Sequence, residues 1–363
     1  MVVLGIESTA HTFGIGIVEN GKILANVKKT YTTEKGGIIP IEAAKHHKEK
    51  KEEIYLEALN KASIQEDKID AIAFSQGPGL SPCLLEGLRF TKELSKKLNK
   101  PIIPVNHCIA HLEIGRLTHA EDPVMLYVSG ANTQIIAYSA NRYRIFGETL
   151  DVGVGNFIDN FARFIGIGFP GGPMIQKLAE QGKSYIELPY TVKGMDITLS
   201  GILTNLKQKV DKINRLNNPN LKTLPTHPNK DNFFINNHIK LRASGDERDY
   251  TIADLAFSMQ ETVFAMLVEV AERALAHTGK KQLLLGGGVA CNSRLQNMAK
   301  IMCEERDASF FCPENSLLVD NGAMIAYLGE IMFSKGIHVK PEEIDGLDIK
   351  PRQRTDEVEV SWK

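Results

Sequence analysis

The spacing of hydrophobic and polar residues predicts strands and helices along almost the whole chain. Apolar runs with many β-branched residues are typical of strands, and they occupy residues 2–6, 13–18, 23–27, 69–74, 101–105, 126–128, 134–138 and 282–289. Apolar residues at helical spacing predict helices over residues 40–63, 84–98, 174–181 and 251–277. An antiparallel start followed by strand, helix and strand units indicates an α/β fold in which parallel strands extend each sheet.

The length of the chain predicts two lobes. Its 363 residues exceed the ~250 to 300 at which a single hydrophobic core stops growing. We expect a first lobe over residues 1–123, a second lobe over residues 124–335 and an extended, peripheral tail over residues 336–363. Residues 211–249 are rich in Asn, Pro and Lys, which favours a solvated loop insert over core structure. A nucleic-acid contact by this insert stays open as an alternative.

Composition limits the classes of protein that fit. A formal net charge of -1 argues against a protein that binds nucleic acid through its whole surface. The five cysteines form no CxxC pair, so we expect reduced thiols. No window reaches ~18 uninterrupted apolar residues, and the first residues lack the pattern of a signal peptide. The sequence therefore predicts a cytoplasmic protein without a membrane segment.

Two histidines form a candidate metal site. His107 and His111 lie four residues apart in a predicted helix, which places both imidazoles on one face. A zinc protease of the HExxH kind needs a glutamate after the first histidine, and Cys108 occupies that position. Tyr127 and the distant Asp320 are candidates for the remaining ligands, and such a mixed set suits iron or zinc. Asp320 could equally be the N-cap of the helix that follows it.

Turns of small residues predict a nucleotide site. Ser-Gly-Ala-Asn-Thr follows the strand at residues 126–128, and its backbone N–H groups could hold phosphate. Asp159 could accept hydrogen bonds from ribose hydroxyls, or it could be a helix cap. Three glycines before Asn292 would allow a purine or ribose to approach the backbone closely. The hydroxyl-rich turn at residues 8–12 is either a further phosphate loop or an ordinary hairpin turn.

Ten segments in order resemble one family: GIESTAHTFG, SQGPGL, VNHCIAHLEIG, LYVSGANTQ, GETLDVGVGNFIDNFAR, PGGP, GMDITLSGILT, SMQETVFAMLVEVAERAL, GGGVACNSRL and DNGAMIA. They are similar to the universal tRNA threonylcarbamoyladenosine family. The residues of these segments are most similar to the archaeal and eukaryotic catalytic subunit of the KEOPS complex and less similar to bacterial TsaD. The resemblance covers almost the whole chain except residues 211–249.

This resemblance implies an actin-like ATPase (ASKHA) fold with two related lobes and a ligand cleft between them. It implies transfer of threonylcarbamoyl from threonylcarbamoyl-AMP to N6 of the adenosine 3′ of the anticodon, in tRNAs that read codons beginning with A. It also implies the partners: tRNA, a small kinase-like ATPase, a small dimerising subunit on the N-terminal helices, and an accessory subunit. No residue stands out as a general base.

By the same resemblance, iron(2+), or alternatively zinc, would be held by His107, His111, Tyr127 and Asp320. Threonylcarbamoyl-AMP, or an ATP- or AMP-type nucleotide, would be held by Tyr127, Val128, Ser129, Gly130, Ala131, Asp159, Gly172, Gln176 and Asn292.

The chain departs from the family pattern at two positions. The usual second glycine of the SGGNT loop is Ala131, which adds a methyl group, and the usual glutamate after PGGP is Gln176, which lacks charge. Both changes bear on adenylate affinity. Three other functions stay open: a small-molecule kinase of the same fold, a metal-dependent glycoprotein endopeptidase, and a non-catalytic scaffold.

Overall fold

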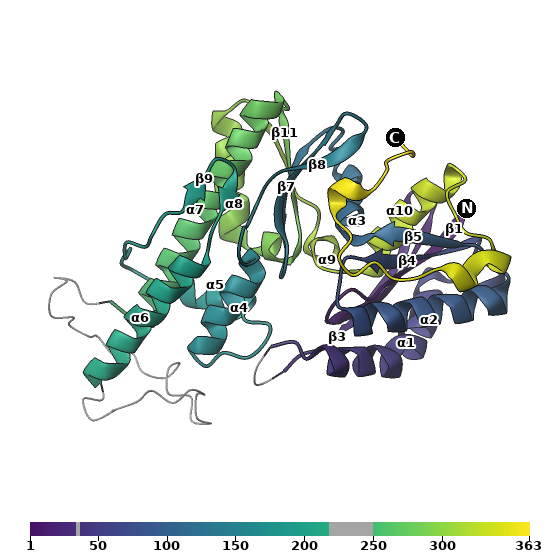
Figure 1. Ribbon diagram of the computed structural model, residues 1–363, viewed down its shortest axis with the longest axis horizontal. Coiled ribbons are helices and arrows are strands. Elements are labelled where there is room, and N and C mark those ends of the chain that lie inside the picture. The colour runs from purple at the N-terminus through teal and green to yellow at the C-terminus, as the bar shows by residue number, and fades with distance from the viewer. Residues whose placement is uncertain (34–36, 218–249) are drawn as a thin grey trace.

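Two five-stranded sheets organise the molecule, each at the centre of one lobe (Figure 1). The computed structural model describes residues 1–33, 37–217 and 250–363. In the first sheet the strand order is β3-β2-β1-β4-β5. Its strands are β1 (Val2–Glu7), β2 (Thr12–Glu19), β3 (Lys22–Thr30), β4 (Ala71–Gly77) and β5 (Ile102–Asn106).

The second sheet repeats the topology of the first. Its strands are β6 (Val124–Val128), β7 (Thr133–Ser139), β8 (Arg142–Glu148), β11 (Gln282–Gly286) and β12 (Ser309–Phe311). The order β8-β7-β6-β11-β12 matches that of the first sheet position by position. In both sheets the first three strands form an antiparallel meander, and the last two strands run parallel to the first. The two lobes are therefore structurally related, as expected.

Helices cover both faces of the first sheet. The long helices α1 (Pro40–Ala62) and α2 (Ser81–Leu98) pack on one face and bury a core with strands β1 to β4. The helix α10 (Gly322–Ser334) packs on the other face, against β1 and β2. Added Cβ atoms at Gly5 and Gly16 would lie 2.2 Å from backbone nitrogens of α10, so only glycine permits this close approach.

The position of α10 corrects the predicted lobe boundary. This helix was assigned to the second lobe within residues 124–335, but it belongs to the first lobe by packing. The reason is that the chain crosses back after α9 (Asn315–Leu318), a change of lobe that periodicity cannot reveal. Asp320 lies in this crossing segment, and α3 (His107–Glu113) with η2 (Ile114–Thr118) forms the other crossing, before β6.

Helices of the second lobe bury the largest core of the molecule. They are α4 (Val154–Phe164), α5 (Gly172–Ala179), α6 (Ser200–Asn217), α7 (Ile252–Thr278) and α8 (Ser293–Glu305), with the turn η3 (Gly288–Cys291) and a small hairpin of β9 (Val192–Lys193) and β10 (Asp196–Ile197). The predicted loop insert at residues 211–249 begins too early, because α6 continues through residue 217. Residues 218–249 lie outside the described residues.

The C-terminal tail is not peripheral, in contrast to the prediction. Its turns η4 (Pro341–Gly346) and η5 (Thr355–Glu357) interrupt an extended path that leaves the first lobe and ends beside β8 in the second (Figure 1). The Trp362 indole is buried and donates from Nε1 to Glu113 Oε1 at 3.0 Å. A single tryptophan in a polar stretch gives no periodic signal, which is why its burial was missed.

All five cysteines are free, in agreement with the expectation of reduced thiols. Among the described residues, every helix is too short or too polar to cross a membrane.

Candidate metal and nucleotide site

The helix α3 presents two histidines side by side. It follows β5 directly, and the Asn106 side chain caps it by accepting a hydrogen bond from the Ile109 N–H at 3.1 Å. The rings of His107 and His111 lie 4.8 Å apart between centroids, and both are buried. The predicted i, i+4 arrangement on one face is therefore present.

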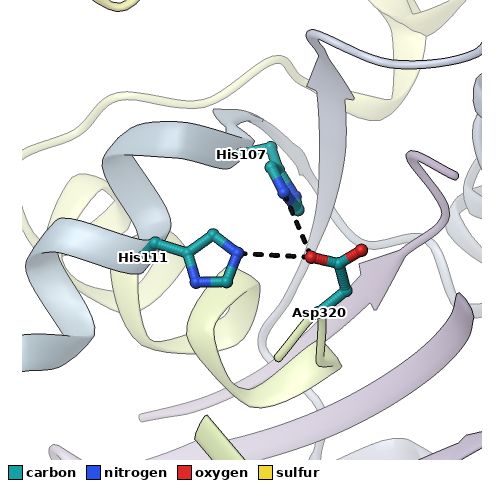
Figure 2. A group of neighbouring side chains, drawn as sticks. All are labelled: His107, His111 and Asp320. Atoms are coloured by element: carbon teal, nitrogen blue, oxygen red, sulfur yellow. Dashed lines mark hydrogen bonds and ion pairs between the residues drawn. The ribbon is translucent and has the colours of Figure 1, made fainter. Parts of the chain in front are cut away.

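Asp320 reaches both histidines from the segment that precedes α10 (Figure 2). Its Oδ1 atom lies 3.4 Å from His107 Nε2 and 3.3 Å from His111 Nε2, and one donor atom from each of the three residues fits within 4.8 Å. The helix cap is supplied by Asn321, whose Oδ1 accepts from the Met324 N–H at 3.0 Å. The alternative reading of Asp320 as the N-cap is therefore wrong.

Glu7, at the end of β1, orients the first histidine. Its Oε2 lies 2.9 Å from His107 Nδ1, and its Oε1 accepts from the Thr9 N–H at 2.7 Å. The carboxylate is fully buried. A carboxylate on Nδ1 favours the tautomer whose Nε2 lone pair faces the cluster, which is the usual support of a metal-binding histidine. Sequence reasoning missed Glu7, although an acid ending a fully apolar strand signals a buried partner.

His107, His111 and Asp320 shift one another's pKa values. Burial disfavours the protonated form of His107, but Glu7 and Asp320 outweigh it and raise the pKa of that ring well above 6.5. Burial lowers the pKa of His111 below 6.5. Burial would raise the pKa of Asp320, but the two histidines hold it well below 3.8. Without an added cation, the two carboxylates therefore favour a protonated His107 ring.

Tyr127 closes the cluster from the end of β6. Its ring lies 5.2 Å from that of His111 between centroids, and its side chain is buried. Burial, together with the nearby Cys108 and Asp320, raises the pKa of the phenol well above 10.0. A divalent cation would reverse this tendency, because it stabilises a phenolate.

The residues fit a divalent transition metal. Two imidazole Nε2 atoms and one carboxylate oxygen converge from two crossing segments, and His111 Nδ1 is buried without a hydrogen-bond partner in the described part of the chain. Nitrogen donors mixed with carboxylate and phenol oxygen suit iron and zinc better than calcium or magnesium.

The predicted phosphate loop packs against the start of α4. The Gly155 and Asn156 N–H groups donate to the Ser129 and Gly130 carbonyls at 3.0 and 2.8 Å. A Cβ added at Gly155 would lie 2.7 Å from Gly130 Cα, so this glycine permits the contact. Ala131 is exposed and has no positive φ, so its methyl group causes no backbone strain. The loop follows Tyr127 and Val128 directly.

The remaining predicted nucleotide residues lie together in the second lobe. Asp159, on α4, accepts with Oδ1 from the Gly171 N–H at 2.8 Å at the start of α5. Asn292 caps α8 and donates from Nδ2 to Gln260 at 2.9 Å. Gln176 donates to Ser293 Oγ at 3.1 Å. These contacts join α4 to α5, α8 to α7, and α5 to α8, respectively.

Two hollows separate these helices. Gly172 and Asn292 line a slot of about 10 Å³, which is too small for a ligand, whereas Gln176 and Ser293 line an open cavity of about 510 Å³. Gln260 borders both.

Backbone groups of the turn at residues 8–12 pair with neighbouring parts of the first lobe, while the Ser8 hydroxyl is buried without a partner among the described residues. The Thr9 N–H donates to Glu7, and the Ala10 carbonyl accepts from His47 Nε2 at 3.1 Å. The Ser8 N–H donates to Ser75 Oγ at 3.0 Å. The ordinary-turn reading accounts for these contacts.

Comparison with known proteins decides the family. A family model described as tRNA N6-adenosine threonylcarbamoyltransferase matches residues 22–327. The chain belongs to this family. It is 51% identical to the tRNA N6-adenosine threonylcarbamoyltransferase of Thermococcus sibiricus over 100% of both chains. It is 46% identical, over 100% of its length and 60% of the relative, to a probable bifunctional tRNA threonylcarbamoyladenosine biosynthesis protein of Methanocaldococcus jannaschii.

Solved structures agree on the fold. HypF from T. kodakarensis superposes with a TM-score of 0.59 at 13% identity, covering 94% of this chain and 49% of that one. At this identity the likeness concerns the fold alone. The predicted α/β fold of the actin-like ATPase class is confirmed, and membership of the threonylcarbamoyltransferase family confirms the predicted transferase class.

Proposed function

We propose that this chain transfers the threonylcarbamoyl group from threonylcarbamoyl-AMP to N6 of the adenosine 3′ of the anticodon, in tRNAs that read codons beginning with A. The observation that carries the proposal is the convergence of His107, His111 and Asp320. This group lies beside Tyr127, which directly precedes the predicted phosphate loop at residues 129–133. One cleft would then hold a metal next to an adenylate. A small-molecule kinase of the same fold would not need this histidine and carboxylate cluster.

In this proposal the metal is iron(2+) or zinc, held by His107, His111, Asp320 and Tyr127. When bound, such an ion supplies Lewis-acid polarisation of the carbamoyl carbonyl. Glu7 keeps the His107 ring fixed with Nε2 toward the ligand position. Because this donor set is fixed by buried side chains on two crossing segments, little reorganisation is needed when substrate binds.

The adenylate would occupy the second lobe. Backbone N–H groups of Gly130 and Ala131 would meet its phosphate, while Ser129 shapes the loop by donating its N–H to the Asn132 carbonyl at 2.9 Å. The nucleoside would lie near Asn292, Gly172 and Gln176, with Asp159 supporting the start of α5. The N6 amine of tRNA attacks the carbamoyl carbon and the new C–N bond forms. The C–O bond to phosphate breaks, AMP leaves with the bonding electrons, and one N6 proton passes to water. The chain acts chiefly by aligning the two reactants.

We further propose that the chain works within a KEOPS-type complex in the cytoplasm, with a kinase-like ATPase, a dimerising subunit and an accessory subunit. The match covers 60% of the bifunctional relative, which therefore has a second part outside the match, in agreement with a partner protein. Ile41 and Leu56 on α1 are 72% and 56% exposed, which gives a partner an apolar surface on the N-terminal helices.

A reconstituted reaction tests the function. The purified chain is combined with candidate partners, tRNA, threonine, bicarbonate and ATP, and modified adenosine is read by mass spectrometry. We expect product with the unmodified chain and at least 100-fold less with His107→Ala or Asp320→Asn, because each change removes a metal ligand. Absence of product with every partner combination, or cleavage of a glycoprotein that depends on His107, would reject the proposal.

A further inference from the structure

Lys28 extends from the edge strand β3 of the first lobe to the crossing segment of the metal site. Its Nζ atom lies 3.4 Å from the Asp320 carbonyl oxygen and 3.4 Å from the Ser316 carbonyl oxygen. Asp320 is the residue whose carboxylate faces the two histidines. The ammonium of Lys28 therefore lies between the two lobes, beside the group formed by His107, His111 and Asp320.

This ammonium has spare hydrogen-bonding capacity. Both contacts are at the long limit for a hydrogen bond, and no carboxylate oxygen of the described residues lies within 4 Å of Lys28 Nζ. Its neighbour Lys29 points to the opposite face of β3 and pairs with Glu53 on α1. The Asp320 carboxylate attracts this partly buried ammonium without touching it, and an anion in direct contact would further lower the cost of its burial.

The surroundings of Lys28 indicate which anion fits. Its ammonium lies within electrostatic range of the Cys291 thiol, directly before Asn292, as well as of Asp320. An adenylate has its phosphate between its nucleoside and its acyl group. If the nucleoside lies near Asn292 and the acyl group near the metal, the phosphate falls between them.

We infer that Lys28 binds the phosphate of the adenylate. This inference rests on the proposed function and adds a residue of the first lobe to a nucleotide site otherwise built by the second. When the C–O bond between the carbamoyl carbon and the phosphate breaks, the departing AMP gains negative charge on that oxygen. The Lys28 ammonium stabilises this charge by an N–H···O hydrogen bond, and no proton leaves the lysine.

Equilibrium binding of AMP and of adenosine to the metal-loaded chain provides the first test. Replacing Lys28 by Met keeps the aliphatic stem and removes the charge. We expect Lys28→Met to weaken AMP binding about 10- to 100-fold, the range for a lost hydrogen bond between charged groups, and to leave adenosine binding unchanged. Lys28→Arg should retain most of the AMP affinity, and Lys29→Met should behave like the unmodified chain.

The reconstituted reaction provides the second test. We expect Lys28→Met to raise the KM for threonylcarbamoyl-AMP by a similar factor, with unchanged metal content by elemental analysis. Equal losses for AMP and adenosine would overturn the inference, because they would reveal a general distortion of the site. Unchanged AMP affinity and KM would overturn it as well. If the unmodified chain makes no product but Lys28→Met still loses AMP selectively, the proposed function fails while the phosphate contact stands.

Discussion

Replacing Glu7 by Gln tests whether the structure builds a supported metal site. The fully buried carboxylate of Glu7 accepts from the Thr9 N–H at 2.7 Å and faces His107 Nδ1 at 2.9 Å. A glutamine has nearly the same shape, but its amide can present either an acceptor or a donor to the ring. When the NH₂ group faces Nδ1, the proton moves to Nε2, and the ring can no longer bind a metal through that atom.

The expected size of the effect follows from this role. Loss of an outer carboxylate on a metal-binding histidine typically reduces metal affinity by about 10- to 100-fold, or about 1.4 to 2.8 kcal/mol. The donors of His111 and Asp320 remain in place, and the glutamine can also turn its carbonyl oxygen toward His107 Nδ1, so binding should be weakened rather than abolished. Competition with a chromophoric chelator measures the dissociation constants for Zn²⁺ and Fe²⁺ under anaerobic conditions.

The chain offers a matched control for this substitution. Glu113 is as deeply buried as Glu7 and ends α3, the helix that carries His107. It pairs with Arg116 and accepts from Trp362, and it does not contact His107 or His111. We expect Glu113→Gln to lower the free energy of unfolding while leaving the metal dissociation constant unchanged. A Glu7→Gln chain that binds both metals as tightly as the unmodified chain would refute the role assigned to Glu7.

Three further predictions concern stability and the nucleotide loop. Burial lowers the pKa of His47 from 6.5 to about 4, so the unfolded chain binds a proton that the folded chain excludes, and the free energy of unfolding should fall by on the order of 3 kcal/mol from pH 6.5 to pH 4. His47→Gln should flatten this pH dependence in urea titrations, and an unchanged slope would contradict the reasoning. Trp362→Ala should lower the free energy of unfolding by about 3 to 5 kcal/mol, and Trp362→Phe by about 1 to 2 kcal/mol, because the former leaves a cavity and the latter mainly loses the hydrogen bond to Glu113. Ala131→Gly should leave the affinity for an adenylate analogue unchanged in calorimetric titrations, because the Ala131 methyl group is exposed and its backbone is unstrained; a large gain in affinity would show that the methyl group obstructs the phosphate.

Sequence patterns predict those helices and strands that are determined by residues close together along the chain. Strands β1 to β7 follow the predicted apolar runs, and α7 matches the helix predicted over residues 251–277. Its N-cap is Thr251, whose side chain accepts from the Asp254 N–H. The spacing of His107 and His111 placed both rings correctly because it depends only on helix geometry. These features need no knowledge of which segments meet in space.

The features that were missed depend on long-range packing. Helix α10 looks like any apolar helix in sequence, and only its contact with Gly5 and Gly16 assigns it to the first lobe. The partnership of Glu7 with His107 joins residues 100 positions apart, and no local pattern encodes it. The assignment of Asp320 as a ligand came from a resemblance as much as from its residue type, and the structure brings it to the histidines.

The wide separation of the metal donors along the chain constrains when an ion can be acquired. His111 and Asp320 are 209 residues apart, so the two histidines leave the ribosome long before the carboxylate that completes their cluster. Closing so long a loop costs roughly 5 kcal/mol of chain entropy before any bond to the ion can repay it. An ion held by these residues would therefore bind tightly only after the second sheet has been made and the chain has returned to the first, so the finished fold rather than the growing chain would acquire it.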